Sequence, residues 1–181
     1  MTASAGTVVD AARQLLAGYG DVEGALIYGS VARGSATAES DVDLFVVTNG
    51  TVDPGEHDRL RLDAGQMQRR LGYQPDPVHT VEVFTADRCV DALTGPLVLR
   101  ATHVVADGQA IDRITVDSDD LEILRALLDR RLTVRASPVV DSLTALAVRQ
   151  VGATARRLEV PLDQVLAGLG LRISDTPEAL P

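Results

Sequence analysis

The sequence predicts an α+β (α/β-like) fold, in which a small mixed β-sheet core with flanking helices is followed by a helical C-terminal extension. Strand-like and helix-like segments alternate through the first part of the chain. Leucines at helical spacing dominate the rest. The 45% hydrophobic and 24% charged residues are typical of folded globular proteins. We therefore expect a core over residues 1–117, a helical extension over residues 118–173 and a flexible tail over residues 174–181.

The expected core begins with a helix and alternates from there. Short apolar or β-branched runs predict its strands, and apolar residues at i, i+4, i+7 and i+11 predict its longest helix. Glycines, prolines and polar turns separate these segments. In chain order we expect a helix over residues 7–17, strands over 25–28 and 41–48, a helix over 56–71, a strand over 78–84, a short helix over 86–93 and an extended piece over 103–106.

Three helices are expected in the extension. The first follows Ser118 as its N-cap and has leucines at helical spacing up to Leu132. The second opens with Ser137-Pro138, a capping residue followed by proline at the first helical position, and extends to about residue 157. The third begins at residues 160–161 and ends near residues 168–170.

The composition excludes several classes of function. Aromatic residues make up only 3% of the chain and tryptophan is absent, which argues against a base-stacking surface for single strands. The net charge of −9 argues against a broad surface for nucleic-acid backbones. All 17 basic residues are arginine. A cationic contact to phosphate must therefore come from arginine, and a lysine nucleophile is excluded.

The single cysteine, Cys89, excludes an intrachain disulfide and a thiolate metal cluster. We interpret it as a small buried apolar residue. The chain shows neither the pattern of a signal peptide nor an apolar stretch of membrane-spanning length. These observations predict a cytoplasmic protein without a membrane partner.

Two acidic residues, Asp41 and Asp43, begin the second expected strand. Residues at i and i+2 of a strand point to the same face, so both carboxylates should lie side by side. Two close like charges are costly unless a cation lies between them. Mg²⁺ takes oxygen ligands and often combines one or two carboxylates with substrate phosphates. The pair therefore predicts a Mg²⁺ site.

A glycine-serine pair ends the first expected strand. Gly29 allows the backbone to approach a ligand closely, and Ser30 offers a hydroxyl and an N–H group where a helical turn starts. Arg33 adds a guanidinium three residues later. This pattern predicts a phosphate site, which a ten-residue loop connects to the carboxylate pair. Arg33 has an alternative role in this interpretation, as an ion-pair partner of Glu39 or Asp41 that fixes the loop.

The stretch IYGSVARGSATAESDVDLFVV resembles the signature of the DNA-polymerase-β-like nucleotidyltransferase superfamily, especially its minimal prokaryotic members. The resemblance assigns triphosphate contact to Gly29 and Ser30, and metal binding to Asp41 and Asp43. The flanking Arg33 and Ser40 also match small prokaryotic members, so they join the expected nucleotide site. The resemblance implies two Mg²⁺ ions and ATP or another nucleoside triphosphate as substrate.

The superfamily also needs a third carboxylate on a later strand, which activates the acceptor hydroxyl. Glu82, an acid between apolar neighbours on an expected strand, fits this role best as a catalytic residue and metal ligand. Its alternative role is an exposed residue on a half-solvated strand. Asp76, in a proline-flanked loop, is the competing candidate.

Other polar residues have plainer interpretations. The three histidines are scattered and lack the spacing of metal ligands, so we expect surface or satisfied core positions. The arginines of the C-terminal part alternate with acids and predict a solvated helix face rather than a phosphate surface. They are Arg125, Arg130, Arg131, Arg135, Arg149, Arg156 and Arg157.

The resemblance leads to one expected function and two alternatives. The expected function is transfer of a nucleoside monophosphate, in the first place AMP from ATP, to a hydroxyl acceptor. The implied acceptors are a partner protein, a tRNA 3′ end or an aminoglycoside, and the acidic composition disfavours tRNA. In the first alternative, an antitoxin-like protein neutralises a toxin-like partner by binding it through the C-terminal helices. In the second, the chain is a pseudoenzyme that binds nucleotide without turnover.

Overall fold

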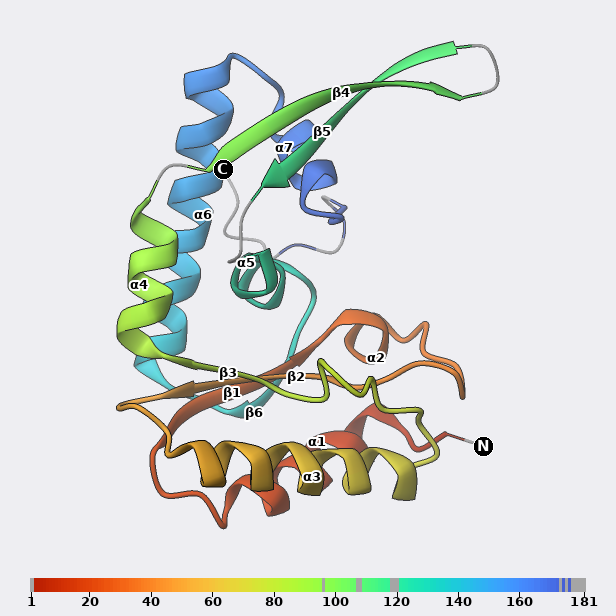
Figure 1. The fold of residues 1–181 in the computed structure, drawn as a ribbon, viewed down its shortest axis with the longest axis vertical. Coiled ribbons are helices and arrows are strands. Elements are labelled where there is room, and N and C mark those ends of the chain that lie inside the picture. The colour runs from red at the N-terminus through yellow and green to blue at the C-terminus, as the bar shows by residue number, and fades with distance from the viewer. Residues whose placement is uncertain are drawn as a thin grey trace.

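The computed structural model describes residues 2–95, 97–106, 109–117, 121–172, 174 and 176 (Figure 1). Its helices are α1 (Ala5–Leu16), α2 (Gly29–Arg33), α3 (Pro54–Arg70), α4 (Ala86–Thr94), α5 (Leu121–Leu128), α6 (Pro138–Leu158) and α7 (Leu162–Gly168). Its strands are β1 (Val22–Tyr28), β2 (Asp43–Thr48), β3 (Glu82–Thr85), β4 (Val98–Ala106), β5 (Gln109–Asp117) and β6 (Leu132–Arg135).

The main sheet has four strands in the order β3-β2-β1-β6. Strand β1 is antiparallel to both of its neighbours, whereas β2 and β3 are parallel. Strands β4 and β5 form a separate antiparallel hairpin, which extends away from the main sheet beside the upper end of α6 (Figure 1). The α+β fold class with a small mixed sheet and flanking helices is confirmed.

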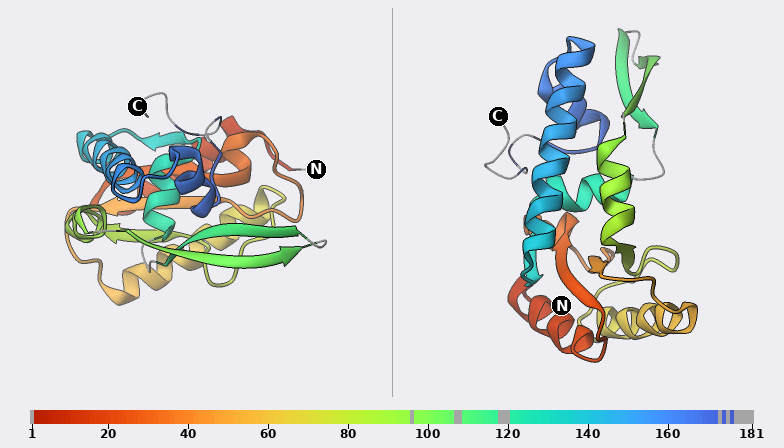
Figure 2. Two further views of the ribbon diagram at one scale, coloured as in Figure 1. Left: turned by 90° about the horizontal axis from the view of Figure 1, so that it is seen from above. Right: turned by 90° about the vertical axis from the view of Figure 1, so that its left-hand side faces the viewer.

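Helices cover both faces of the main sheet (Figures 1 and 2). Alternate residues of a strand point to opposite faces, and β1 divides its apolar side chains accordingly. Ala25 and Ile27 pack with α1 and α3, whereas Leu26 and Tyr28 pack with the helices from α4 onwards. Cys89 is buried in this second cluster, as its apolar interpretation requires.

Local sequence signals fix where several helices begin. Ser4 caps α1, and Asp53 and Ser137 cap α3 and α6, each followed by a proline in the first turn. A cap of this kind stabilises a helix by about 1 kcal/mol. Gly24 fixes the position of α6, because a Cβ atom there would lie 2.5 Å from Cγ2 of Val140. The long helix therefore packs directly against the backbone of β1.

Two parts of the sequence-based prediction were wrong. The helix expected to include Leu132 ends at Leu128, and residues 132–135 form β6 beside β1. Residues 109–117 form a strand that was not expected, paired with a β4 much longer than the predicted extended piece. Both errors have the same cause: strand pairing is non-local, and short segments carry little periodic signal.

Smaller differences concern the ends of elements. The two strands expected from residues 41 and 78 start at Asp43 and Glu82. Ser118 and most of the expected tail lie outside the described residues. The boundary at residue 117 stays a prediction, with β6 belonging to the sheet of the expected core. None of the described helices is long and apolar enough to cross a membrane.

Candidate active site

The predicted motif lies where β1 ends and β2 begins. Tyr28, the last residue of β1, is paired with Asp43, the first residue of β2. Helix α2 follows β1 directly, and α5 lies above the sheet on the side that α4 and α6 also cover (Figure 1). A cavity of about 220 Å³ opens between these elements, lined by Tyr28, Gly29, Arg33, Asp43, Glu122, Arg125, Asp129, Gly170 and Leu171.

Gly29 and Asp43 fit together at the floor of this cavity. Gly29 has a φ of +69°, which disfavours any residue with a side chain. A Cβ atom at this position would lie 1.9 Å from Oδ2 of Asp43. From the sequence, this glycine was expected to admit a ligand. In the structure, the space at this glycine is taken by the carboxylate of Asp43.

The environment of Asp43 disfavours its charged form. Burial raises the pKa of this carboxyl group to about 7, and the charges of Asp41 and Glu122 act in the same direction. Arg33 opposes this shift. A buried acid among other acids is the arrangement that a bound cation stabilises.

Asp41 lies near Asp43 but lines a different hollow. It lies two residues before the first residue of β2 and faces a space of about 290 Å³ that Gln74, Asp76 and two prolines also line. Asp76, the competing third acid, accepts hydrogen bonds from the N–H groups of Val78 (2.6 Å) and His79 (2.9 Å). These bonds hold the pKa of Asp76 below its usual value. Asp76 therefore shapes the loop before β3.

Glu82 lies on the cavity face of the sheet. It is paired with Phe45 in the parallel ladder between β2 and β3, and Phe45 shares its face with Asp43 two residues earlier. Oε1 of Glu82 lies 2.6 Å from Nδ1 of His79. This hydrogen bond raises the pKa of His79. The Glu82 side chain is 18% exposed, so the interpretation as an exposed strand residue does not apply.

Gln68 of α3 holds the two acidic segments in place. Its fully buried amide accepts a hydrogen bond from the N–H of Val42 (3.0 Å) and donates to the carbonyls of Val42 (3.1 Å) and Thr80 (3.0 Å). Val42 lies between Asp41 and Asp43, and Thr80 lies two residues before Glu82. One side chain thus fixes the spacing between both predicted metal-binding segments, a role that the sequence analysis missed.

The cation of the motif pairs with an unexpected partner. Arg33 forms an ion pair with Oδ2 of Asp129, rather than with Glu39 or Asp41. The same Oδ2 accepts a hydrogen bond from the N–H of Gly29 at 3.1 Å. The Asp129 side chain is only 3% exposed. One buried carboxylate therefore binds two of the groups that were predicted to hold phosphate.

The two serines differ in their surroundings. Ser30 is partly exposed in the first turn of α2, at the edge of the site. The hydroxyl of Ser40 accepts a hydrogen bond from the N–H of Thr37 at 3.0 Å, and its carbonyl accepts one from Gln74. Ser40 therefore stabilises the loop between α2 and β2. Its predicted contact to nucleotide stays a prediction.

The donor set suits Mg²⁺ through two carboxylates rather than three. Among the residues that the structure describes, no three His, Cys, Asp or Glu side chains are placed to hold a metal ion. Asp41 and Asp43 nevertheless interact electrostatically, and one or two carboxylates with substrate phosphates are an ordinary Mg²⁺ environment. The acids around Asp43 outnumber the one cation that acts on it, so the residues fit a divalent cation.

Residues 11–84 match the family described as Polymerase beta, Nucleotidyltransferase. This segment belongs to the polymerase-β-like nucleotidyltransferase superfamily. It contains Gly29, Ser30, Asp41, Asp43 and Glu82, so every residue to which the resemblance gave a catalytic or metal role lies inside the nucleotidyltransferase segment.

Comparison with solved structures gives a further similarity. A toxin-antitoxin crystallised with AMP-PNP is similar to this chain with a TM-score of 0.45 and 12% sequence identity, over 83% of this chain and 89% of that one. A comparison with curated proteins gives no match.

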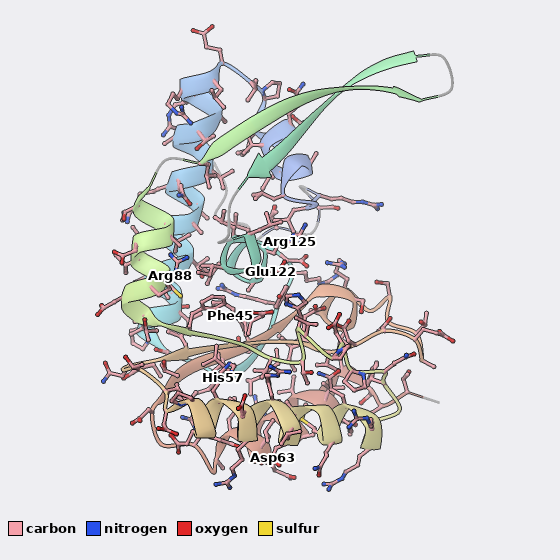
Figure 3. All side chains as sticks on the ribbon, in the orientation of Figure 1. Phe45, His57, Asp63, Arg88, Glu122 and Arg125 are labelled. Atoms are coloured by element: carbon pink, nitrogen blue, oxygen red, sulfur yellow. The ribbon has the colours of Figure 1, made fainter. Side chains whose placement is uncertain are left out.

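The nucleotidyltransferase segment does not enclose the site alone. The hydroxyl of Tyr28 donates to Oε2 of Glu122 (3.0 Å), whose Oε1 pairs with Arg125 at 2.9 Å. Nε of Arg125 donates to the carbonyl of Leu169 at 2.9 Å. Figure 3 shows Glu122 and Arg125 on α5, above the sheet face that carries Phe45. The cavity is thus closed by residues that follow the matched segment.

These residues were not predicted from the sequence. The spacing of Glu122 and Arg125 at i and i+3 on a helix was the available signal for the pair. Nothing local indicates that α5 lies over β1. The prediction of a solvated arginine face was wrong for Arg125 and Arg157, whose guanidinium groups donate to the carbonyls of Leu169 and Leu97.

Proposed function

We propose that the chain is a Mg²⁺-dependent nucleotidyltransferase that transfers a nucleoside monophosphate, in the first place AMP from ATP, to a hydroxyl acceptor. The fit between Gly29 and Asp43 carries this proposal. This fit places the buried carboxylate of Asp43, whose pKa is raised, next to the end of β1. Asp41 lies beside it, and Glu82 lies on the same face of the sheet. A stable fold has no need of this concentration of acids, whereas a site for a cation and a triphosphate does.

Each predicted residue has a role in the proposed site. Asp41 and Asp43 would hold two Mg²⁺ ions, which when bound would lower the acceptor's pKa and neutralise the leaving pyrophosphate, and Glu82 would act as the base. Gly29, Ser30 and Arg33 would bind the β- and γ-phosphates, since the chain has no lysine for this purpose. Ser40 would keep the loop before Asp41 in position.

The proposed reaction is an in-line displacement. The acceptor oxygen forms a bond to the α-phosphorus, the bond to the bridging oxygen breaks, and pyrophosphate leaves. Glu82 takes the proton of the acceptor hydroxyl, and His79 holds the carboxylate of Glu82 in one orientation through the 2.6 Å hydrogen bond. A protein hydroxyl is the acceptor that we favour, because the net charge of −9 disfavours RNA.

A transfer assay tests this proposal. Purified protein is incubated with Mg²⁺, ATP labelled in its α-phosphate and a cell lysate, and transferred label is measured on protein and RNA fractions. We expect labelled protein with the wild type and none with Asp41→Ala/Asp43→Ala. The control variant Asp58→Ala/Asp91→Ala removes the same charge from two exposed helix positions and should retain activity. Equal labelling by the wild type and the Asp41/Asp43 variant would contradict the proposal, as would the absence of any labelled acceptor.

Binding of a protein partner is a second candidate function, favoured by a groove between α4 and α6. The groove has a volume of about 470 Å³ and is lined by Leu93, Leu146, Arg149, Gln150, Arg157 and four smaller residues. The buried Oε1 of Gln150 has no hydrogen-bond partner in the part of the chain that the structure describes. An antitoxin-like chain would use this surface to bind a toxin-like partner. If the Asp41→Ala/Asp43→Ala variant still neutralises a partner encoded beside it, binding rather than transfer is the function.

The pseudoenzyme alternative makes a different prediction. Glu82 is hydrogen-bonded to His79. Among the described residues, it does not form a three-ligand group with Asp41 and Asp43. A chain that binds nucleotide without turnover would bind ATP tightly and release no pyrophosphate with any acceptor. A pyrophosphate-release assay therefore separates this alternative from the proposed enzyme.

A further inference from the structure

We propose that Asp129 is a built-in competitor of the nucleotide, whose carboxylate occupies the phosphate position at Gly29 and Arg33 until the triphosphate displaces it. This inference rests on the proposed function and concerns how that same site is regulated. It adds Asp129, which lies outside the matched segment, as the residue that sets nucleotide affinity.

The contacts of Asp129 are those of a bound anion. Oδ2 accepts the N–H of Gly29 at 3.1 Å and pairs with the guanidinium of Arg33. Oδ1 accepts the N–H of Arg130 at 2.7 Å. Arginine and backbone N–H groups bind carboxylate and phosphate oxygens with similar geometry. A phosphate oxygen therefore cannot take the position of Oδ2 at the Gly29 N–H and Nη1 of Arg33 while Asp129 occupies it.

The absence of lysine makes competition for Arg33 important for phosphate binding. Because lysine is absent, a phosphate at the motif depends on arginine and on backbone N–H groups. Arg33 is the arginine of the motif, and its side chain is 35% exposed while that of Asp129 is 3% exposed. A ligand in the cavity can thus reach the guanidinium and compete with the buried carboxylate for it.

Asp129 lies in a short connection between a helix and a strand. Asp129 is the first residue after α5, in the three-residue connection that leads to β6. It lines the same cavity as Asp43 and Glu122, both acids. In the proposed displaced state, the Asp129 side chain has rotated away from the Gly29 N–H and Arg33. The motif would then present its donors to the triphosphate.

The expected effect follows from the populations of the two states. When ligand binds only the displaced state, the apparent dissociation constant is raised by the reciprocal of that state's population, so a population of about one in ten weakens binding about tenfold. Asp129→Asn keeps an oxygen for the Gly29 N–H but removes the charge that holds Arg33. We expect this variant to bind the nucleotide about tenfold more tightly than the wild type.

Isothermal titration calorimetry with a non-hydrolysable ATP analogue and Mg²⁺ tests the inference, with tripolyphosphate as a second probe that lacks base and ribose. Asp129→Asn should bind both probes about tenfold more tightly. Asp58→Asn, which removes one exposed charge from α3, should bind as the wild type does. In Asp129→Asn/Arg33→Gln the gain should disappear, because the freed cation is missing.

Unchanged or weaker binding by Asp129→Asn, with normal binding by the wild type, overturns the inference and makes Asp129 a residue that positions Gly29. Failure of every variant and of the wild type to bind either probe defeats the proposed function, and this inference with it. A measurement on the wild type covers the case in which Asp129→Asn does not fold. The ¹³Cγ resonance of Asp129 should shift when tripolyphosphate is added, and an unshifted resonance in the saturated protein overturns the inference.

Discussion

The carboxylate of Asp43, the first residue of β2, lies where a side chain would be at Gly29, the first residue of α2, so position 29 excludes any residue larger than glycine. A Cβ atom at Gly29 would approach Oδ2 of Asp43 to 1.9 Å. The glycine of the motif is thus required by an acid of the motif, fourteen residues later in the chain. This dependence gives the first prediction.

Gly29→Ala should lower the free energy of unfolding by more than about 2 kcal/mol, since it combines a left-handed backbone with a steric clash. Gly34 supplies the matched control, because its φ is +76° but no atom lies within 4 Å of its Cβ position. Gly34→Ala should therefore show only the backbone cost of about 1 kcal/mol. Chemical denaturation measures both. Restored stability in Gly29→Ala/Asp43→Gly would confirm that the clash is with Asp43, and equal losses at positions 29 and 34 would contradict it.

The stability of the metal-free protein should depend on the ionisation of Asp43. The folded-state pKa of about 7 exceeds the ordinary value of 3.8, so the folded state binds this proton more tightly than the unfolded chain. The resulting stability is fully present below pH 3.8 and is lost as the pH rises through 7. Asp43→Asn cannot ionise, so its advantage over the wild type should grow across this range.

Urea denaturation with a chelator, from pH 4 to 8, checks this expectation. The difference should reach a few kcal/mol, since one pKa unit corresponds to about 1.4 kcal/mol. Parallel stability profiles for both proteins would contradict it. Mg²⁺ added at pH 8 should stabilise the wild type and leave Asp43→Asn largely unchanged, because only the charged carboxylate attracts the ion.

Gln68→Met should remove the link between the segment that carries Asp41 and Asp43 and the segment that carries Glu82. The variant retains the volume but removes three hydrogen bonds to buried backbone groups of Val42 and Thr80. Each unsatisfied buried group costs about 1–3 kcal/mol. We expect reduced stability, and a transfer rate that falls more than nucleotide affinity does. Exposed Gln66 of the same helix supplies the control Gln66→Met. An unchanged rate in folded Gln68→Met would show that the spacing does not matter.

His79 and Glu82 should affect turnover in different ways. Glu82→Gln removes the proposed base and should lower the transfer rate by at least about a hundredfold. His79→Gln keeps a hydrogen-bond donor beside Glu82 and should lose much less activity than His79→Ala. Single-turnover measurements with labelled ATP distinguish the variants. Full activity of Glu82→Gln would assign the third acid elsewhere.

The sequence predicted the parts of the fold that depend on local signals. The cap at Ser137 and the period of α3 were predicted because the residues that produce these signals lie within a few positions of one another. The motif residues could be found for the same reason, since Gly29 and Asp43 belong to one short signature. Strand β6 could not be found, because its stability comes from β1, about a hundred residues away.

The contacts of the site also divide into local ones, which could be predicted, and distant ones, which could not. Arg33 was assigned to phosphate from its distance along the chain to Ser30, but its ion-pair partner Asp129 is 96 residues away. Glu122 reaches Tyr28 across 94 residues. Such pairs depend on how α5 is placed over the sheet. A single sequence contains no periodic or spacing signal for that placement.

Strand β6 has a consequence for any shortened form of the protein. Residues 11–84 include β1 and β2, but β1 is an interior strand only because β6 pairs with its other side. Removal of everything after residue 117 would leave a row of N–H and C=O groups on β1 without partners, an open edge of the kind that recruits strands from other molecules. Such a fragment should aggregate, so the family segment depends on the last third of the polypeptide for its solubility.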